Sequence, residues 1–127
     1  MKLYIGGAYN GKLELALKEN NKSIEDVFFC DNGEIDFSRD IICGIDKLIY
    51  DNAINKKETL TYFEKNVDKL RGKIIICDEI SQGIVPIKRE ERFFREETGR
   101  ILQFLSKESK CVIRVFFGLA QILKDEK

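Results

Sequence analysis

The sequence predicts an α/β fold in which helices cover both faces of a mostly parallel β-sheet. Short apolar runs alternate with stretches of helical periodicity along the 127 residues, which is typical of strands joined by crossover helices. One run, residues 73–77 (KIIIC), is unbroken and has the character of a strand buried on both faces of a parallel sheet. A glycine-rich loop between the first apolar run and the first helical stretch is the third observation.

Length and composition fit one domain that spans residues 1–127. The 22 basic and 22 acidic side chains balance, so no nucleic-acid-binding surface is indicated. No apolar run reaches the length of a membrane span, and no signal-peptide pattern begins the chain. The four cysteines include no C-x-x-C pair, and Cys77 and Cys111 lie in apolar runs, which predicts reduced core thiols in a cytoplasmic protein. Histidine is absent, which argues against a zinc site and excludes imidazole catalysis.

The glycine-rich loop has the spacing of a phosphate-binding motif. A strand at 2–5 (KLYI) leads into GGAYNGK at 6–12, which satisfies G-x-x-x-x-G-K, and a helical stretch at 12–18 (KLELALK) follows. Glycines let backbone N–H groups approach a phosphate, and Lys12 adds a positive charge at the start of a helix. Leu13 occupies the position of the Ser or Thr that would bind Mg²⁺.

We interpret this loop as a phosphate cradle without its metal ligand. The alternative is a simple glycine turn, and the strand before the loop and the helix after it favour the cradle. The fold class is therefore that of the P-loop NTPases. The predicted nucleotide-binding residues of the loop are Gly6, Gly7, Ala8, Tyr9, Asn10, Gly11, Lys12 and Leu13.

Between this loop and the buried strand at 73–77, the sequence predicts one strand and two helices. Residues 27–30 form the strand and are followed by turn residues. Apolar residues from 41 to 49 recur at helical spacing. A second helix begins at a Thr59 cap, and its apolar stripe continues to a stop at Gly72.

After the buried strand, the sequence predicts one long helix and one strand. Residues 89–106 have helical periodicity. The side chains expected to face the core are Phe94, Ile101, Leu102 and Leu105. Residues 111–117 (CVIRVFF) are the last expected strand, and Gly118 follows them.

Two acids, Asp78 and Glu79, directly follow the buried strand. Ligands of such sheets bind beyond the C-terminal ends of the strands, where the glycine loop, Asp31 and this acidic pair are expected to gather. One acid there can hold Mg²⁺ through water, and a second can orient a nucleophile. The alternative is that both acids only solubilise a loop or cap the next helix. The glycine loop favours the functional interpretation, so Lys12, Asp78 and Glu79 are the predicted catalytic residues.

Part of the chain resembles a known family. Residues 77–105 (CDEISQGIVPIKREERFFREETGRILQFL) and 116–124 (FFGLAQILK) resemble the SNEVGxGIVP, FRDxxGRxNQ and AGLPxxLK patterns of adenosylcobinamide kinase/adenosylcobinamide-phosphate guanylyltransferase. The opening GGAYNGK is similar to that family's GGARSGKS. The matching residues are Glu79, Gly83, Ile84, Val85, Pro86, Arg89, Arg92, Phe94, Arg95, Gly99, Arg100, Gln103, Gly118, Leu119 and Lys124.

The resemblance implies a role in cobalamin (vitamin B12) biosynthesis. The implied reaction transfers the γ-phosphate of ATP or GTP to the aminopropanol hydroxyl of a cobinamide-type corrinoid. The resemblance also implies a homo-oligomer, and it implies nucleotide contacts near Phe29, Cys30 and Asp31 at the end of the second strand. Mg²⁺ is a weaker expectation, because the side chain of Leu13 has no oxygen.

The chain departs from the family at positions that matter for the chemistry. In the family, an H-R-x-x-R-P motif supplies a His that becomes guanylylated, and this chain has no His, so guanylyl transfer by that route is not expected. The family's loop Arg-Ser is Tyr9-Asn10 here. Its central-strand Asp has three alternatives: Asp31, Asp40 and Cys43. The alternative function is a catalytically degenerate nucleotide-binding or regulatory protein that keeps the fold.

Overall fold

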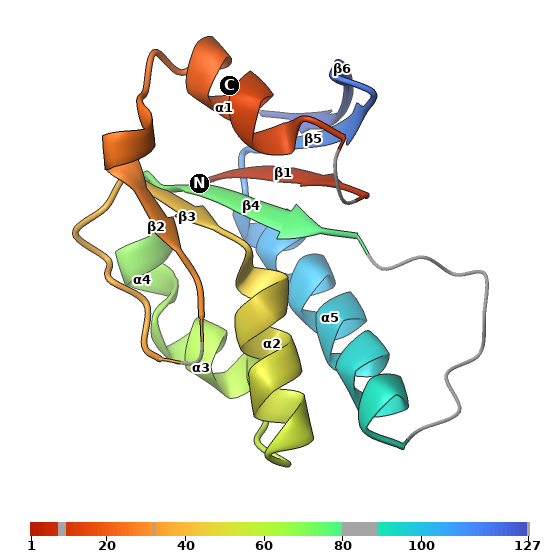
Figure 1. Cartoon of the computed structure of the whole chain (residues 1–127). Coiled ribbons are helices and arrows are strands. Elements are labelled where there is room, and N and C mark those ends of the chain that lie inside the picture. Colours follow the sequence, from red (N-terminus) through yellow and green to blue (C-terminus); the bar gives the residue numbers. More distant parts are fainter. Residues whose placement is uncertain (8–9, 32, 80–88, 127) are drawn as a thin grey trace.

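The strands of the computed structural model form one sheet (Figure 1). The structure describes residues 1–7, 10–31, 33–79 and 89–126. Within these residues the strand order is β2-β3-β4-β1-β5-β6, and every pairing except β5–β6 is parallel. The strands are β1 (Lys2–Gly6), β2 (Val27–Phe29), β3 (Ile41–Cys43), β4 (Ile74–Asp78), β5 (Cys111–Phe116) and β6 (Leu119–Asp125). The predicted mostly parallel sheet is confirmed.

Helices cover both faces of this sheet, so the predicted fold class is confirmed as well. Helix α1 lies on one face, and α2 to α5 lie on the other (Figure 1). The helices are α1 (Lys12–Glu19), the 3₁₀ helix η1 (Ile24–Asp26), α2 (Ile45–Ile54), α3 (Leu60–Lys65), α4 (Val67–Leu70) and α5 (Arg89–Glu108). None of the helices in the described part of the chain has the length and apolarity that crossing a membrane requires.

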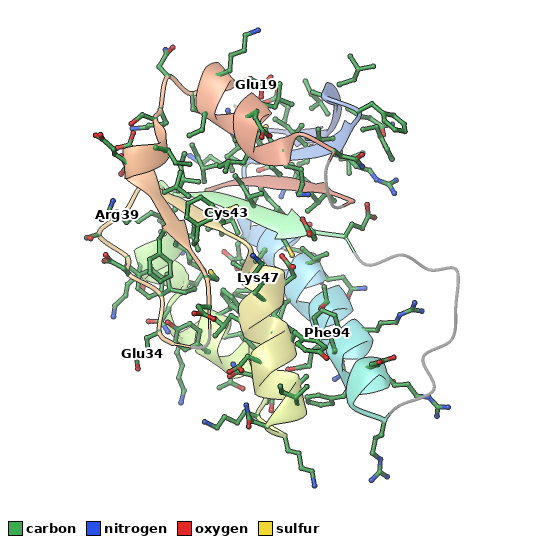
Figure 2. All side chains as sticks on the ribbon, in the orientation of Figure 1. Glu19, Glu34, Arg39, Cys43, Lys47 and Phe94 are labelled. Carbon is green, nitrogen blue, oxygen red and sulfur yellow. The ribbon has the colours of Figure 1, made fainter. Side chains whose placement is uncertain are left out.

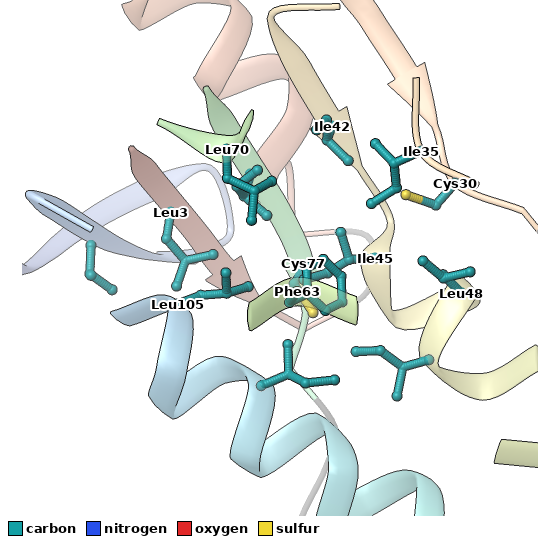
Figure 3. Close-up of a cluster of buried hydrophobic side chains, with 14 residues drawn as sticks. Leu3, Cys30, Ile35, Ile42, Ile45, Leu48, Phe63, Leu70, Cys77 and Leu105 are labelled. Atoms are coloured by element: carbon teal, nitrogen blue, oxygen red, sulfur yellow. The ribbon is translucent and has the colours of Figure 1, made fainter. Parts of the chain in front are cut away.

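Alternating side chains of the central strands enter two separate hydrophobic clusters. Leu3 and Ile75 pack in the larger cluster, with residues of α2 to α5 (Figure 3). Tyr4 and Ile76 pack in the smaller cluster, with Ala16 of α1. This is the period-two pattern of strands that are buried on both faces. Each fully buried Leu or Ile side chain stabilises the fold by about 1.5–3 kcal/mol.

The helix expected over residues 41–49 is instead a strand followed by a helix. Ile41–Cys43 forms β3, which pairs with both β2 and β4. Gly44, with a φ of 79°, turns the chain into α2. Isoleucines fill apolar positions of helices and strands alike, and their branching at Cβ favours the strand. The prediction was wrong for residues 41–43 because pairing with distant strands decides between the two.

The helix expected between Thr59 and Gly72 is divided at Asn66 into α3 and α4. Thr59 precedes α3, but its hydroxyl accepts a hydrogen bond from the Asn52 amide of α2 at 3.0 Å and does not cap the helix. The Thr59 backbone N–H donates to the buried Glu97 carboxylate of α5 at 2.9 Å. This threonine therefore joins α2 to α5. It stands at the cap position of α3, but its side chain does not cap that helix.

The strand expected over residues 111–117 ends one residue earlier, and the edge strand β6 follows it unpredicted. Phe117 and Gly118 have φ angles of 49° and 76° and form the turn between β5 and β6, as in a type I′ hairpin. Most of β6 is exposed. An edge strand without a buried face lacks the alternation of apolar and polar residues that reveals a strand in a sequence.

Candidate phosphate-binding site

The glycine loop begins where β1 passes close to β5. A Cβ atom on Gly6 would lie 2.5 Å from the Val115 carbonyl oxygen, so no other residue fits there without displacing the backbone. At the other end of the loop, Gly11 has a φ of 82° and its carbonyl accepts the Leu15 N–H of α1 at 3.1 Å. A close backbone approach thus requires glycine at position 6, and a left-handed conformation favours glycine at position 11. The loop ends at a helix N-terminus, where anions bind. The predicted residues Ala8 and Tyr9 lie outside the described residues.

Lys12 is the buried cation of this site. Its side chain is 5 % exposed, and its Nζ atom lies 2.7 Å from the Gly7 carbonyl oxygen and 2.6 Å from Asp78 Oδ1. A buried ammonium is stable only when it is paired and hydrogen-bonded. The loop and the end of β4 therefore hold the Lys12 ammonium in a buried position that requires an anion beside it.

The contact between Lys12 and Asp78 follows from strand pairing. β1 and β4 are parallel neighbours in a register that places Gly6 opposite Asp78. The Glu79 N–H donates to the Gly6 carbonyl at 2.6 Å, so the two strand ends stay together where the chain leaves the sheet. The loop after β1 and the acid at the end of β4 thus meet at one edge of the sheet, where ligands of such folds bind.

Asp46, in the first turn of α2, is a further acid of this site that the sequence analysis missed. Its Oδ1 atom accepts the backbone N–H of Asp78 at 3.1 Å. Burial raises the pKa of Asp46 above its ordinary value, and the nearby Asp78 carboxylate raises it further. The signal in the sequence is the position of Asp46 two residues after Gly44, and it is readable only when 41–43 is recognised as a strand.

These groups surround a cavity of about 340 Å³, which we call the inner cavity. Its lining includes Lys12, Leu13, Phe29, Cys43, Asp46 and Asp78. Cys43 and Lys47, which also lines the cavity, come from the end of β3 and the first turn of α2 (Figure 2). Burial and the neighbouring Asp46 and Asp78 raise the pKa of the Cys43 thiol to about 11.

Glu79 points to a different partner from Asp78. Its Oε2 atom lies 2.9 Å from Arg114 Nε of β5. The Arg114 guanidinium lies 4.6 Å from the centre of the Phe116 ring. The two adjacent acids after β4 therefore have separate environments: Asp78 pairs with the loop lysine, and Glu79 pairs with an arginine on the other side of β1.

The other predicted residues divide between the inner cavity and the rest of the molecule. Phe29 lines the cavity, but Cys30 belongs to the larger hydrophobic cluster, where burial raises its pKa to about 12. Asp31 is exposed and is not among the described residues that line the cavity. Asp40 pairs with Lys22 at 3.0 Å before the start of β3. Of the three alternatives for the family's central-strand Asp, only Cys43 lies at the inner cavity.

Carboxylates of the inner cavity suit Mg²⁺ only in part. Among the described residues, no group of three or more His, Cys, Asp or Glu side chains is placed to hold a metal ion. Proteins commonly bind Mg²⁺ with one or two carboxylates and the phosphates of a nucleotide. Asp46 and Asp78 supply carboxylates that would hold the ion in this way, while Leu13 supplies no hydroxyl. An ion bound there would neutralise phosphate charge.

Comparison with known proteins gives one family match. A family model described as cobinamide kinase / cobinamide phosphate guanyltransferase matches residues 40–123. This range covers about two thirds of the chain and includes Cys43, Asp46 and Asp78, whereas the glycine loop precedes it. No curated protein matches the chain.

Proposed function

The chain belongs to the cobinamide kinase / cobinamide phosphate guanyltransferase family, and we propose that it acts on the kinase side of that pair. In this proposal the glycine loop binds a nucleoside triphosphate. The γ-phosphate passes to a hydroxyl group of a cobinamide-type corrinoid. The reaction belongs to cobalamin biosynthesis, as the family does.

The observation that carries the proposal is the burial of Lys12 between the Gly7 carbonyl and the Asp78 carboxylate. A lysine in this position is costly to bury unless an anion compensates it. Asp78 is 42 % exposed, so its carboxylate is accessible to solvent and can give way to a phosphate. A nucleotide phosphate bound by the loop amides then shares or replaces Asp78 as the partner of Lys12.

Positioning and charge neutralisation provide most of the catalysis in phosphoryl transfer. The acceptor hydroxyl oxygen forms a bond to the γ-phosphorus while the bond from that phosphorus to the bridging oxygen breaks. Lys12 and the loop amides stabilise the negative charge on the transferring and leaving oxygens. The hydroxyl proton goes to a carboxylate, for which Asp46 is the candidate, since it lines the inner cavity and only its Oδ1 accepts the Asp78 N–H.

Guanylyl transfer through a covalent intermediate is excluded from the proposal. The 127 residues contain no His. The Cys43 thiol lies in the inner cavity, but its pKa of about 11 keeps it protonated at neutral pH, and the thiol is a far weaker nucleophile than the thiolate. Incubation with radiolabelled GTP followed by denaturation should leave no GMP on the protein. A stable adduct would restore the guanylyltransferase activity and assign a Lys or Cys as its nucleophile.

Nucleotide-induced thermal stabilisation tests the binding part of the proposal. A nucleotide present at 100 times its Kd should stabilise the native state by about 2.7 kcal/mol. Lys12→Ala should abolish this stabilisation, while Lys65→Ala, at an exposed lysine of α3, should leave it unchanged. An equal stabilisation in Lys12→Ala would show that the loop is only a turn.

Transfer of labelled γ-phosphate to cobinamide tests the catalytic part. Wild-type protein should form labelled cobinamide phosphate, and Lys12→Ala should not. Binding of nucleotide without any transfer would favour the alternative, a nucleotide-binding protein that has kept the fold and lost the chemistry.

A further inference from the structure

A cavity rich in lysine lies at the N-terminal edge of the sheet, at the opposite end of β1 from the glycine loop. It has a volume of about 350 Å³, and we call it the basic cavity. Its lining includes Lys2, Lys22, Lys73 and Lys110. β1 runs from Lys2 at this cavity to the start of the glycine loop (Figure 1), so an extended segment of about 13 Å separates the two places.

Parallel pairing brings three of these lysines together at the starts of neighbouring strands. β4, β1 and β5 are adjacent in the sheet. Lys2 pairs in register with Ile74 of β4 and Cys111 of β5. Lys73 and Lys110 directly precede these two partners. Because neighbouring strands lie about 4.8 Å apart, the three lysines start from backbone positions that span only about 10 Å.

Acidic partners are scarce around the basic cavity. No Asp or Glu occurs among the described residues that line it. Asp40 pairs with Lys22 Nζ at 3.0 Å, and Lys2 Nζ donates to the uncharged Asn20 Oδ1 at 3.1 Å. Within the described part of the chain, no carboxylate forms an ion pair with the three lysines at the strand starts. Their positive charges are therefore left uncompensated by the protein.

This local excess of charge is unfavourable without a bound anion. Like charges on neighbouring strands repel one another and destabilise the pairing. Lys2 and Lys73 are half-buried, and solvent screens partly buried charges less than exposed ones. Asp125 of β6 stands opposite Cys111 in the strand register but is not part of the lining, so its single charge leaves an excess. The equal numbers of acids and bases in the whole chain conceal this cluster.

The shape and the spread of charge indicate the class of ligand. A concave cavity of this size suits a small molecule. Lysine ammonium groups bind phosphate as compact point charges. The lysines are distributed over the starts of three strands, so a single phosphate group is too small to contact all of them, whereas linked phosphates can.

We propose that the basic cavity is a second anion site, which binds a small ligand with at least two phosphate groups. Lys2, Lys73 and Lys110 neutralise the charge of this ligand. The site is separate from the phosphates at Lys12, because the linings of the basic cavity and the inner cavity share no described residue. The inference does not depend on the proposed function.

Titration calorimetry with phosphate, pyrophosphate and tripolyphosphate tests the ligand class and the lysines. Affinity should rise from phosphate to tripolyphosphate. Lys73→Gln combined with Lys110→Gln should lower the tripolyphosphate affinity of the basic cavity by about tenfold or more, because two charged hydrogen-bond donors are lost. The matched control combines Lys65→Gln with Lys107→Gln, at exposed lysines of α3 and α5, and should bind tripolyphosphate as wild type does.

Two cysteines distinguish this site from the glycine loop without any variant. Cys111 lines the basic cavity, whereas Cys43 lines the inner cavity. Bound tripolyphosphate should slow alkylation of Cys111 by uncharged iodoacetamide, since the anion covers the thiol and disfavours its thiolate. Mass spectrometry measures the labelling of each cysteine. The double variant at Lys73 and Lys110 should lose this protection, and the control variant should keep it.

Three results would overturn the proposal. Protection of Cys43 without protection of Cys111 would place the anion at the glycine loop alone and leave the proposed function standing. Equal tripolyphosphate affinities in the two double variants would show that the lysines at the strand starts have no special role. Phosphate that binds as tightly as tripolyphosphate would exclude a ligand with linked phosphates.

Discussion

The two cavities beside the glycine loop are built in different ways. The inner cavity is formed by the C-terminal ends of parallel strands and the first turns of α1 and α2, and its Lys12 ammonium is held between the Gly7 carbonyl and the Asp78 carboxylate. The outer cavity, of about 480 Å³, lies between the side of α1 and the β5–β6 turn at the edge of the sheet, and its lining is Gly11, Glu14, Leu15, Lys18 and Gly118. The charged groups of the inner cavity are thus positioned by the sheet, whereas one wall of the outer cavity is a turn at the edge of the sheet.

The two cavities therefore differ in how precisely their walls are positioned. Parallel pairing sets the positions of Asp78 and Gly6 to within a residue, which suits the precise geometry that transfer of a phosphoryl group needs. The hairpin contacts the loop through Gly118 and can change its side chains with little effect on the core. The chemistry should therefore depend on the inner cavity.

The largest expected effect separates chemistry from binding at the inner cavity. Asp46→Asn keeps an oxygen that can accept the Asp78 N–H, but the amide cannot accept the proton of an acceptor hydroxyl. The kcat of phosphoryl transfer should fall by about 10²-fold, while the affinities for GTP and ATP measured without Mg²⁺ stay unchanged. Asp68→Asn, at an exposed aspartate of α4, is the control. An unaltered kcat in Asp46→Asn would mean that the inner cavity contributes no proton acceptor here.

The next effect comes from a substitution that displaces the glycine loop, which borders both cavities. Gly6→Ala places a methyl group 2.5 Å from the Val115 carbonyl oxygen, which forces β1 and β5 apart beneath the loop. We expect the free energy of unfolding to fall by about 1–3 kcal/mol, together with nucleotide binding. Chemical denaturation measures the first and calorimetry the second. In Gly33→Ala the added methyl group has open space, so that variant should behave as wild type. Equal stability of the two variants would contradict the steric argument.

A smaller effect concerns the metal side of the inner cavity. Leu13→Ser restores a hydroxyl at the position where complete loops bind Mg²⁺. The ratio of nucleotide affinity with Mg²⁺ to affinity without it should be about tenfold larger than in wild type, since one ligand oxygen is gained. Leu17→Ser, further along α1, is the comparison for a loss of apolar contact, because both leucines pack partly against the smaller hydrophobic cluster. Strong Mg²⁺ dependence in wild type would show that Asp46 and Asp78 already hold the ion.

The smallest expected effect is the pH dependence that Asp46 adds to stability. Burial raises the pKa of Asp46 above its ordinary value of 3.8, so this carboxyl binds a proton more tightly in the folded protein than in the unfolded chain. Its contribution to stability is fully present below pH 3.8 and is lost as the pH rises through the raised pKa. The stability of wild type relative to Asp46→Asn should therefore fall across that interval. Parallel denaturation series of both proteins would measure the difference, and a constant difference would show that the carboxyl has its ordinary pKa.

Local features of the chain determined the loop and the central strand. The motif residues Gly6, Gly11 and Lys12, and the apolar run before Asp78, are each readable from a few neighbours, because a strand buried on both faces and a turn at a helix start have distinctive local patterns. The expected meeting of the loop with Asp78 also agrees with the structure, since parallel strands bring their C-terminal ends to one edge.

Only the tertiary structure decided the elements whose residues suit more than one conformation. Ile41–Cys43 became a strand because β2 and β4 lie on both sides of it, and this pairing is what revealed Asp46 as part of the site. β6 has no buried face and was found only through its pairing with β5. Glu79 and Asp78 are adjacent in the sequence, yet their partners are Arg114 and Lys12. Such contacts join residues far apart in the chain, and no local pattern of residue types contains them.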